Sequence, residues 1–579
     1  MMKIRLATVF SGIGAIEHAL DRMGVPHEIV FACDNGDVDI FSKEIPLDLD
    51  VVADELKSLR ERVSALHFND DVKELYKKQL DNMLGATDRE LGKIRSRLGS
   101  AFLLDGTESL KAFTVKVLME GDMSASRKKK LKLSFLALDK GSRLQRRFAF
   151  LSLVLDLLSY CRDNARFPLP IGLSSVYDGY DGYNVVRSLL DISQRVGQLY
   201  EKINTLEIQL RLEGMGDDWD ARKKYVDGLY GKVWDRNMVM RSYTANYDID
   251  PKDFHWNICF LDGKQYEGQV DLFVGGSPCQ SFSMMGKQRG LEDTRGTLFY
   301  EFARLVKEVR PKVFIYENVR SVLYHDKGNT WKVMKGVFDD IGYSYSYEIL
   351  NSKDYGIPQN RHRLFVVGFR KDIVLERPFV FPPKMPLDRK MQDFLVSNAP
   401  GRYFLPEKGV RFVTKDSNLS KSITQIDGDV QLCQKKNQQF NWKGDFVFQS
   451  EKDAEREGIP DLEKYFLSAK TLKQVMLGGT KSYYTKPETD LPVARALMKT
   501  MHKMHRAGVD NYVTTAGRLR RLTPRECLRL MGFSDAFRIV VSDTAMYQQA
   551  GNSIVVDVLV NIMGKILESY PALGENGED

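Results

Sequence analysis

The sequence predicts an α/β fold: parallel strands with helices on both faces, interrupted by a long helical insertion and followed by a small strand-rich domain. Three observations support this prediction. A strand, a glycine turn, a helix and a second strand follow one another within residues 5–34. The same order returns within residues 270–317. Between the two units, apolar residues repeat every three or four positions, which is typical of long helices packed along a seam.

Size and composition set the frame for this organisation. The chain has 579 residues, more than one ordinary hydrophobic core, so two or three domains are expected. A net charge of +7 leans toward a polyanionic partner. The six cysteines lack metal-ligand spacing and the first residues lack a signal-peptide core, so we expect a cytoplasmic protein without a metal. The longest apolar run, "FAFLSLVLDLLSYC", is too short to cross a bilayer, and we expect no membrane segment.

The first strand-turn-helix unit carries the features of a nucleoside site. Gly12 and Gly14 form a turn at which the backbone can approach a ligand closely. A dinucleotide fingerprint would have its third glycine where this chain has Glu17, and a diphosphate there would meet a carboxylate. Asp34 ends the second strand, where an acid binds a ribose hydroxyl in dinucleotide folds. The combination favours a nucleoside without a diphosphate, such as S-adenosylmethionine, over a turn without a ligand.

Residues 41–240 form the expected helical insertion. Its apolar positions follow two heptad seams, at Val52, Leu56, Leu59, Val63 and Leu66 and at Leu189, Ile192, Val196, Leu199, Ile203, Leu206 and Leu210. Two antiparallel helices joined along these seams would return the chain to the α/β core. We favour this internal antiparallel coiled coil, and hence a monomer, over a dimer contact. The basic stretch 127–132, "RKKKLK", is either a solvated face, which we favour, or a nucleic-acid contact.

The remaining segments complete the organisation. In residues 241–370, the helix "GTLFYEFARLVKEVR" places Leu298, Phe302, Leu305, Val306 and Val309 on one face and ends before Pro311. Residues 371–517 are turn-rich and lack periodicity, which predicts a small domain of short strands and loops. Residues 518–579 return to helices that pack in a core. Residues 1–40, 241–370 and 518–579 would therefore form one α/β domain.

A cysteine and a carboxylate are expected to face one crevice. Cys279 lies in the loop "GGSPCQSFS" after one strand, and Glu317 ends the next strand in "FIYENVR". In an open parallel sheet, ligands bind beyond the carboxyl ends of the strands. A thiol in such a loop can serve as a nucleophile, although an isolated cysteine is more often structural.

The order of motifs around Cys279 resembles the DNA (cytosine-5)-methyltransferase family, bacterial or phage type. The resemblance rests on "VFSGIGA", "GGSPCQSFS", "GKQRGLEDTRGTLF", "ENV", "YGIPQNRHRLFVVGF", "GRLRRLTPRECLRLMGF" and "QQAGNSIVVDVL". These motifs stand in the family's order and cover about half of the chain. The resemblance implies a Rossmann-like domain that depends on S-adenosylmethionine, with residues 371–517 as a target-recognition domain.

The resemblance also implies roles for particular residues. Cys279 would add to carbon 6 of cytosine and so make carbon 5 nucleophilic. Glu317 would stabilise the charge that develops at ring nitrogen 3. The paired arginines Arg361 and Arg363 would fix the base carbonyl by their planar donor geometry, although such a basic stretch can also lie on the surface. Because these atoms are stacked inside a duplex, the cytosine must be flipped out.

Further residues are assigned by their position in the matching motifs. Contacts with DNA are implied for Gln280, Ser281, Ser283 and Arg289, of which the first three could instead only form the turn. Contacts with the cofactor are implied for Phe10, Ser11, Gly12, Gly14, Asp34, Asn257, Ile258, Pro278, Asn552 and Ser553. The chain departs from the family in having Asn257 where an aspartate is common, and in its helical insertion.

The implied function is methyl transfer from S-adenosylmethionine to carbon 5 of a flipped cytosine within a specific duplex DNA sequence. Double-stranded DNA is the expected partner, together with a cognate restriction or defence nuclease or, for an orphan enzyme, none. Four alternatives compete with this function: a cysteine hydrolase using Cys279 with His362, an amino-group methyltransferase, a tRNA methyltransferase, and a non-catalytic DNA-binding or scaffold protein. An amino-group methyltransferase would need an active-site turn with an aromatic after a proline pair, and the sequence has none. The sequence lacks the "CFT" tripeptide common in the tRNA branch, and it retains Cys279, Glu317, Arg361 and Arg363.

Overall fold

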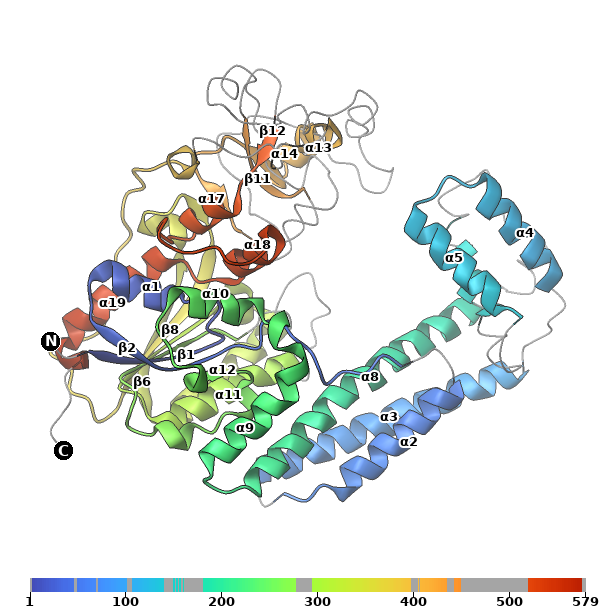
Figure 1. Ribbon diagram of the computed structural model, residues 1–579, viewed down its shortest axis with the longest axis horizontal. Helices are drawn as coiled ribbons and strands as arrows, with labels where there is room; N and C mark the ends of the chain where they lie inside the picture. The colour runs from blue at the N-terminus through green and yellow to red at the C-terminus, as the bar shows by residue number, and fades with distance from the viewer. Residues whose placement is uncertain are drawn as a thin grey trace. The chain divides into compact units, whose positions relative to one another are not determined.

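The computed structural model describes residues 3–45, 49–68, 71–100, 107–139, 181–277, 294–396, 407–434, 442–448 and 519–574, with isolated positions within 149–160 and 403–405. The chain forms two compact units (Figure 1). The α/β unit consists of Met1–Val38 and Asp217–Asp579, and the helical unit is Asp39–Gly216.

The α/β unit is built on a seven-stranded sheet in the order β3-β2-β1-β4-β5-β8-β6. Its strands are β1 (Ile4–Val9), β2 (His27–Cys33), β3 (Phe254–His255), β4 (Leu272–Gly275), β5 (Val313–Val319), β6 (Tyr343–Asn351) and β8 (His362–Arg370). The strand order reverses between β1 and β4. Loops that leave neighbouring strands in opposite directions open a crevice beyond the carboxyl ends, so this switch point is the expected place for a ligand.

One strand departs from the predicted parallel sheet. β1 to β5 run parallel, whereas β8 runs antiparallel to both β5 and β6. The reason is the connection of residues 352–361 between β6 and β8, which is too short for a crossover helix and so permits only antiparallel pairing. The sheet is therefore mixed, and the expectation of a wholly parallel sheet was wrong at this edge.

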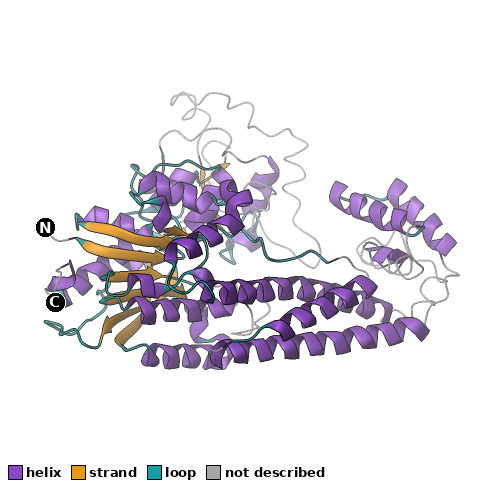
Figure 2. Ribbon diagram, turned by 60° about the horizontal axis from the view of Figure 1, so that its bottom comes forward, coloured by secondary structure: helices purple, strands orange, loops and turns teal. Residues whose placement is uncertain are grey.

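Helices cover both faces of the sheet (Figure 2). α1 (Ala15–Met23) and α19 (Val556–Ser569) share one hydrophobic core with Leu272 and Val274 of β4. α11 (Thr294–Val309) and α12 (Asn329–Asp340) share the other core with Phe273, which lies between Leu272 and Val274 in β4. Because successive side chains of a strand point to opposite faces, the unbroken apolar run of β4 is explained by burial on both sides.

The C-terminal helices are part of the first core. They are α17 (Pro524–Arg529), α18 (Asp543–Asn552) and α19. By length and composition alone, residues 543–569 could cross a membrane, and they are the one such segment in the described part of the chain. The segment is broken between α18 and α19, and α19 packs on α1 with Leu559, Ile562 and Ile566 buried. We therefore interpret it as core helix.

The segment expected to form a separate small domain contains short elements. They are α13 (Glu407–Val413), α14 (Asp416–Leu419), β9 (Thr424–Ile426), β10 (Gln431–Leu432) and β11 (Gly444–Phe448). β11 pairs with β9 and with β12 (Leu519–Arg521), so a strand pairing crosses the expected boundary at residue 517. β10 pairs with β7 (Gln359–Asn360). Residues 449–518 lie outside the described residues.

The helical unit is held by three buried heptad seams. Its helices are α2 (Leu49–Ala65), α3 (Asp71–Ser100), α4 (Thr107–Glu120), α5 (Ala125–Ala137) and α8 (Asp181–Glu213). The two seams read from the sequence lie on α2, with Leu66 just past its end, and on α8, and nearly all of their residues are buried. The third seam, on α3, consists of Leu80, Leu84, Thr87, Leu91 and Ile94.

The direction of these helices corrects the expected arrangement. Glu55 of α2 bonds to Tyr200 of α8, and Arg62 of α2 bonds to Glu207 of α8. The residue numbers differ by 145 in both pairs, so the two helices run parallel. α3 instead runs antiparallel to α2, because Lys77 bonds to the carbonyl of Leu66 and Asp88 pairs with Arg60. The antiparallel partner of α2 is thus α3, and α8 completes a three-helix bundle.

The helical unit also ends earlier than expected, at Gly216 rather than at residue 240. α9 (Trp219–Tyr230) and α10 (Met238–Asn246) belong to the α/β unit. Tyr230 stacks on Trp256, with ring centroids 4.6 Å apart, and Tyr243 bonds to Glu17 of α1. These buried aromatic contacts hold the segment to the sheet.

Candidate active site

The turn between β1 and α1 forms an open cradle at the switch point. Phe10, Gly12 and Gly14 have positive φ angles of 53°, 56° and 75°. Glycine adopts this left-handed conformation without strain, whereas Phe10 does so at a cost. Among the described residues, only the carbonyl oxygen of Phe10 comes within 4 Å of a Cβ built on Gly12, at 3.9 Å. The space beside Gly12 is therefore open to a ligand.

Asp34 lies directly against this cradle. Its Oδ2 accepts a hydrogen bond from the backbone N–H of Gly12 at 2.9 Å, and its Oδ1 accepts one from Gly36 at 2.8 Å. Ser11 joins the turn to β2, because its Oγ accepts from the N–H of Cys33 at 3.0 Å. These bonds place the Asp34 carboxylate, an acceptor of hydrogen bonds from hydroxyl groups, at the edge of the cradle.

Asn257 and Ile258 follow β3 on the same side of the sheet. The Oδ1 of Asn257 accepts from the N–H of Cys259 at 3.0 Å, and its Nδ2 donates to the Tyr230 hydroxyl at 3.1 Å. One amide hydrogen and one lone pair of Asn257 remain for a ligand. The open cradle and the adjacent carboxylate fit a nucleoside such as S-adenosylmethionine.

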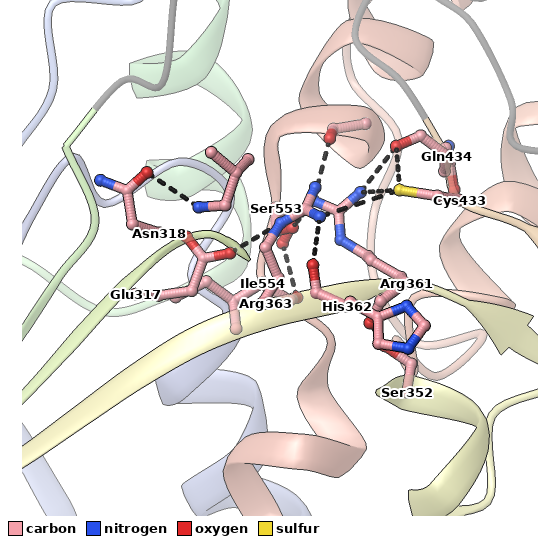
Figure 3. Close-up of polar contacts among 12 residues, drawn as sticks. Glu317, Asn318, Ser352, Arg361, His362, Arg363, Cys433, Gln434, Ser553 and Ile554 are labelled. Atoms are coloured by element: carbon pink, nitrogen blue, oxygen red, sulfur yellow. Dashed lines mark hydrogen bonds and ion pairs between the residues drawn. The ribbon is translucent and has the colours of Figure 1, made fainter. Parts of the chain in front are cut away.

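Glu317 lies near the carboxyl end of β5 and pairs with Arg363 of β8. The distance from Arg363 Nε to Glu317 Oε1 is 3.0 Å (Figure 3). Burial raises the pKa of Glu317, and the positive charges of Arg363 and Arg361 oppose that rise. Gly276 packs against this carboxyl: a Cβ on Gly276 would lie 3.0 Å from Glu317 Oε2 and 2.9 Å from the Glu317 carbonyl oxygen.

The start of the Cys279 loop is anchored to β5 by three polar side chains. The hydroxyls of Ser277 and Tyr316 are 2.6 Å apart, and Asn318 Nδ2 donates to both, at 3.3 and 2.7 Å. All three residues are buried. Sequence reasoning missed this anchor, although the "ENV" motif contains Asn318 and was the available signal.

Arg361 lies where the sequence predicts but is engaged differently. Its Nη1 donates to the carbonyl of Gln434 at 2.6 Å, and its Nη2 donates to the carbonyls of Gly551 and Ser553 at 3.2 and 2.8 Å (Figure 3). The side chain is almost fully buried. Arg361 therefore joins three chain segments, and its role toward the base stays a prediction.

The structure places the other predicted residues only in part. Ser553 is buried and holds Arg361 through its backbone, whereas Asn552 is exposed. Pro278, Cys279, Gln280, Ser281, Ser283 and Arg289 lie outside the described residues. Cys433, which sequence reasoning passed over, lies with its Sγ 3.9 Å from Nη1 of both Arg361 and Arg363. In the described ranges, no group of three His, Cys, Asp or Glu residues could hold a metal ion.

The site thus combines an open glycine cradle at the switch point of a Rossmann-like sheet with a half-buried Glu–Arg pair, formed by the carboxyl end of β5 and the start of β8. Residues 208–568 match the family model described as C-5 cytosine-specific DNA methylase. Because the match covers more than half of the chain, the protein belongs to this family. It is a DNA (cytosine-5-)-methyltransferase, and this membership decides against the cysteine-hydrolase alternative.

Relatives similar in sequence include proteins of phages and bacteria. The orphan methyltransferase M.SPRI of Bacillus phage SPR is 28% identical over 445 residues, which cover 65% of this chain and 98% of that protein. The type II methyltransferase M.HhaI of Haemophilus parahaemolyticus is 29% identical over 331 residues, 57% of this chain and 84% of that protein. The solved structure of the Entamoeba histolytica methyltransferase EhMeth covers 57% of this chain and 86% of its own, with 18% identity and a TM-score of 0.37.

Proposed function

We propose that the protein methylates cytosine through a covalent adduct of Cys279. The observation that carries this proposal is the half-buried Glu317–Arg363 pair, packed on Gly276 three residues before Cys279. The thiolate of Cys279 would form a bond to carbon 6 of cytosine while the ring electrons move toward nitrogen 3. Carbon 5 becomes nucleophilic as a result. After methylation, loss of the carbon 5 proton and expulsion of the thiolate restore the ring and the enzyme.

Glu317 and Arg363 have complementary parts in this proposal. Burial raises the pKa of Glu317, which favours the protonated carboxyl that can donate to ring nitrogen 3. Arg363 holds the carboxyl in place through Nε, and its planar guanidinium offers further donors toward the base carbonyl. Arg361 acts as a positioning residue, since it ties β8 to the segments around Gln434 and Ser553.

The family uses S-adenosylmethionine, which supplies an electrophilic methyl group when bound. We assign its binding to the cradle of Phe10, Ser11, Gly12 and Gly14, with Asp34 for the ribose and Asn257 and Ile258 for the base. Pro278, Asn552 and Ser553 complete the proposed contacts. No step in this proposal requires a metal ion.

The DNA contacts are proposed on the same basis. Gln280, Ser281, Ser283 and Arg289 would hold the flipped cytosine's backbone and fill the gap in the duplex. Residues 371–517 would read the target sequence through the major groove. The relatives include type II and orphan methyltransferases, so we propose a monomeric cytoplasmic enzyme of prokaryotic cells or phage-infected hosts, acting in restriction-modification, in phage defence or as an orphan.

Bisulfite sequencing of DNA from cells that express the protein tests activity and target together. The wild type should protect cytosines within one sequence context, whereas Cys279→Ala and Glu317→Gln should not. Wild type and Cys279→Ala giving the same conversion pattern would overturn the catalytic assignment.

A trapped adduct tests the nucleophile directly. With S-adenosylmethionine and DNA containing 5-fluorocytosine at the target, the wild type should remain bound to DNA in a denaturing gel, since fluorine blocks the elimination step. Cys433→Ser is the matched control, because this second thiol lies close to Arg363. An adduct that persists in Cys279→Ala but disappears in Cys433→Ser would show that the nucleophile is Cys433 and not Cys279.

A further inference from the structure

The chain returns from the helical unit through a segment that touches every described element of the proposed cofactor site. We propose that residues 217–247 act as a brace that positions this site, with Tyr243 and Tyr247 as positioning residues for S-adenosylmethionine. This inference rests on the proposed cofactor site. The brace residues are Tyr230, Asn237, Tyr243 and Tyr247.

Tyr247 supports the glycine turn from behind. Its hydroxyl donates to the carbonyls of Gly14 and Ile13, at 2.7 and 3.2 Å. Its ring occupies the space where a side chain on Gly14 would lie, since a Cβ there would be 2.1 Å from the ring. Gly14 is therefore required by Tyr247 as well as by its positive φ, and the ring fixes how the turn enters α1.

Tyr243 holds the same turn through a buried carboxyl. Its hydroxyl donates to Oε1 of Glu17, which also accepts from the Thr8 hydroxyl at 3.2 Å. The Thr8 hydroxyl lies 2.8 Å from Ser11 Oγ, so the chain of contacts ends in the cradle itself. Glu17 is fully buried, and its Oε2 has no hydrogen-bond partner among the described residues. Losing the Tyr243 hydroxyl would leave this carboxyl poorly satisfied.

The other two residues of the brace reach the remaining cofactor elements. Asn237 is fully buried, and its Nδ2 donates to the backbone carbonyl of Asp34 at 2.9 Å. Tyr230 bonds to Asn257. The brace thus contacts the β1–α1 turn, the end of β2 and the loop after β3. These three segments are separate in the sequence, and the brace joins them through side-chain contacts.

The test measures binding of S-adenosylhomocysteine and S-adenosylmethionine to the full chain by calorimetry, well below the melting temperature. Tyr243→Phe and Tyr247→Phe should each weaken binding by about fivefold to tenfold, the size expected for one buried hydrogen bond. The KM for S-adenosylmethionine should rise by a similar factor, with kcat and the KM for DNA less affected.

Tyr343→Phe is the matched control. Tyr343 is also buried and donates to a backbone carbonyl, that of Pro311 at 2.6 Å, but it lies near the opposite end of β5 from Glu317. It should lower the melting temperature without changing cofactor affinity. If Tyr243→Phe and Tyr247→Phe behave like this control, the brace is merely structural and the inference fails. If the wild type itself binds neither compound, the cofactor site is wrong instead.

A second inference rests on an independent observation, the charge of α5. This helix carries five basic residues and no acidic one: Arg127, Lys128, Lys129, Lys130 and Lys132. Lys130 pairs with Asp156, and the Arg127 guanidinium lies over the ring of Tyr160. Lys128, Lys129 and Lys132 are exposed and form no ion pair with any described residue. By contrast, α2 alternates acids and bases as a solvated face usually does.

We infer that α5 contacts the phosphate backbone of the DNA substrate outside the target sequence. The family membership supplies a polyanionic substrate, and three exposed lysines without an ion-pair partner among the described residues are complementary to it.

The experiment compares binding to a short duplex of about 20 base pairs and a long duplex of about 60 base pairs over a range of salt concentrations. The variant Lys128→Gln/Lys129→Gln/Lys132→Gln should reduce the slope of log affinity against log salt by up to about 2.7 on the long duplex. A variant that neutralises the exposed Lys57, Lys78 and Arg89 of α2 and α3 is the matched control. Equal slopes for the two variants would overturn the inference.

Discussion

At the scale of single residues, Gly276 sets the position of the Glu317 carboxyl, the proposed general acid. A methyl group at this position would lie about 3 Å from both the carbonyl and the Oε2 of Glu317, closer than ordinary van der Waals contact. Gly276→Ala should therefore displace Glu317 and reduce methyl transfer by about 10²-fold or more, the range expected for a displaced general acid. Single-turnover rates with near-normal DNA affinity would check this. Wild-type rates in the variant would show that Glu317 tolerates the shift.

The protonation of Glu317 gives a second residue-scale prediction. Because burial raises its pKa in the folded protein, the folded state binds this proton more tightly than the unfolded chain does. The stability from the protonated carboxyl is fully present below the unfolded pKa and is lost as pH rises through the folded pKa. Unfolding free energies of wild type and Glu317→Gln should thus diverge above the ordinary glutamate pKa, with the wild type losing more. Parallel pH profiles would contradict a raised pKa.

Residue types in ordered motifs revealed much of the site, but not how each side chain is used. The motifs singled out Glu317, Arg363, Asp34 and Gly12, but the Glu317–Arg363 ion pair and the hydrogen bond between Gly12 and Asp34 were found only in the structure. Arg361 could not be separated from Arg363 by pattern, since its three carbonyl partners lie about 70 and 190 residues away. The brace was missed for the same reason, because tyrosines on a helix carry no sign of their distant partners.

At the scale of elements, heptad patterns predicted the helices of the insertion but not their directions. A seam such as that of α8 packs equally well against a parallel or an antiparallel neighbour. The direction is fixed instead by polar pairs such as Arg62–Glu207 and by the turn between α2 and α3. β8 shows the same limit, since its antiparallel direction follows from a short connection rather than from its apolar pattern.

The bundle gives an element-scale prediction. Leu199 of α8 is fully buried in the core of the helical unit. Leu199→Ala should lower the unfolding free energy of that unit by about 2–5 kcal/mol. Calorimetry of the full chain should show the helical transition moving to lower temperature while the α/β transition stays. Lys57→Ala, at an exposed position of α2, should move neither. A shift of both transitions would mean that the two units unfold together.

At the scale of the whole molecule, the insertion is tolerated because the chain segments that lead into it and out of it are held together within the α/β unit. The chain leaves soon after Asp34, and Asn237 binds the Asp34 carbonyl and packs on Gly36 on the way back. A long excursion costs little more loop entropy than a short one once its ends are held together. The sequence predicted that the insertion ends at residue 240, because the helices of the α/β unit follow those of the insertion without a change in apolar periodicity.

Closure of the seams within one chain predicts the state of association. The apolar positions of α2, α3 and α8 face one another in a single core, so none of the three seams is left for a second chain. Light scattering of the full chain should therefore give the mass of one copy across a wide range of concentrations. A mass of two copies that falls to one in Leu199→Asp would show that α8 pairs between chains, and would replace the internal bundle with a dimer contact.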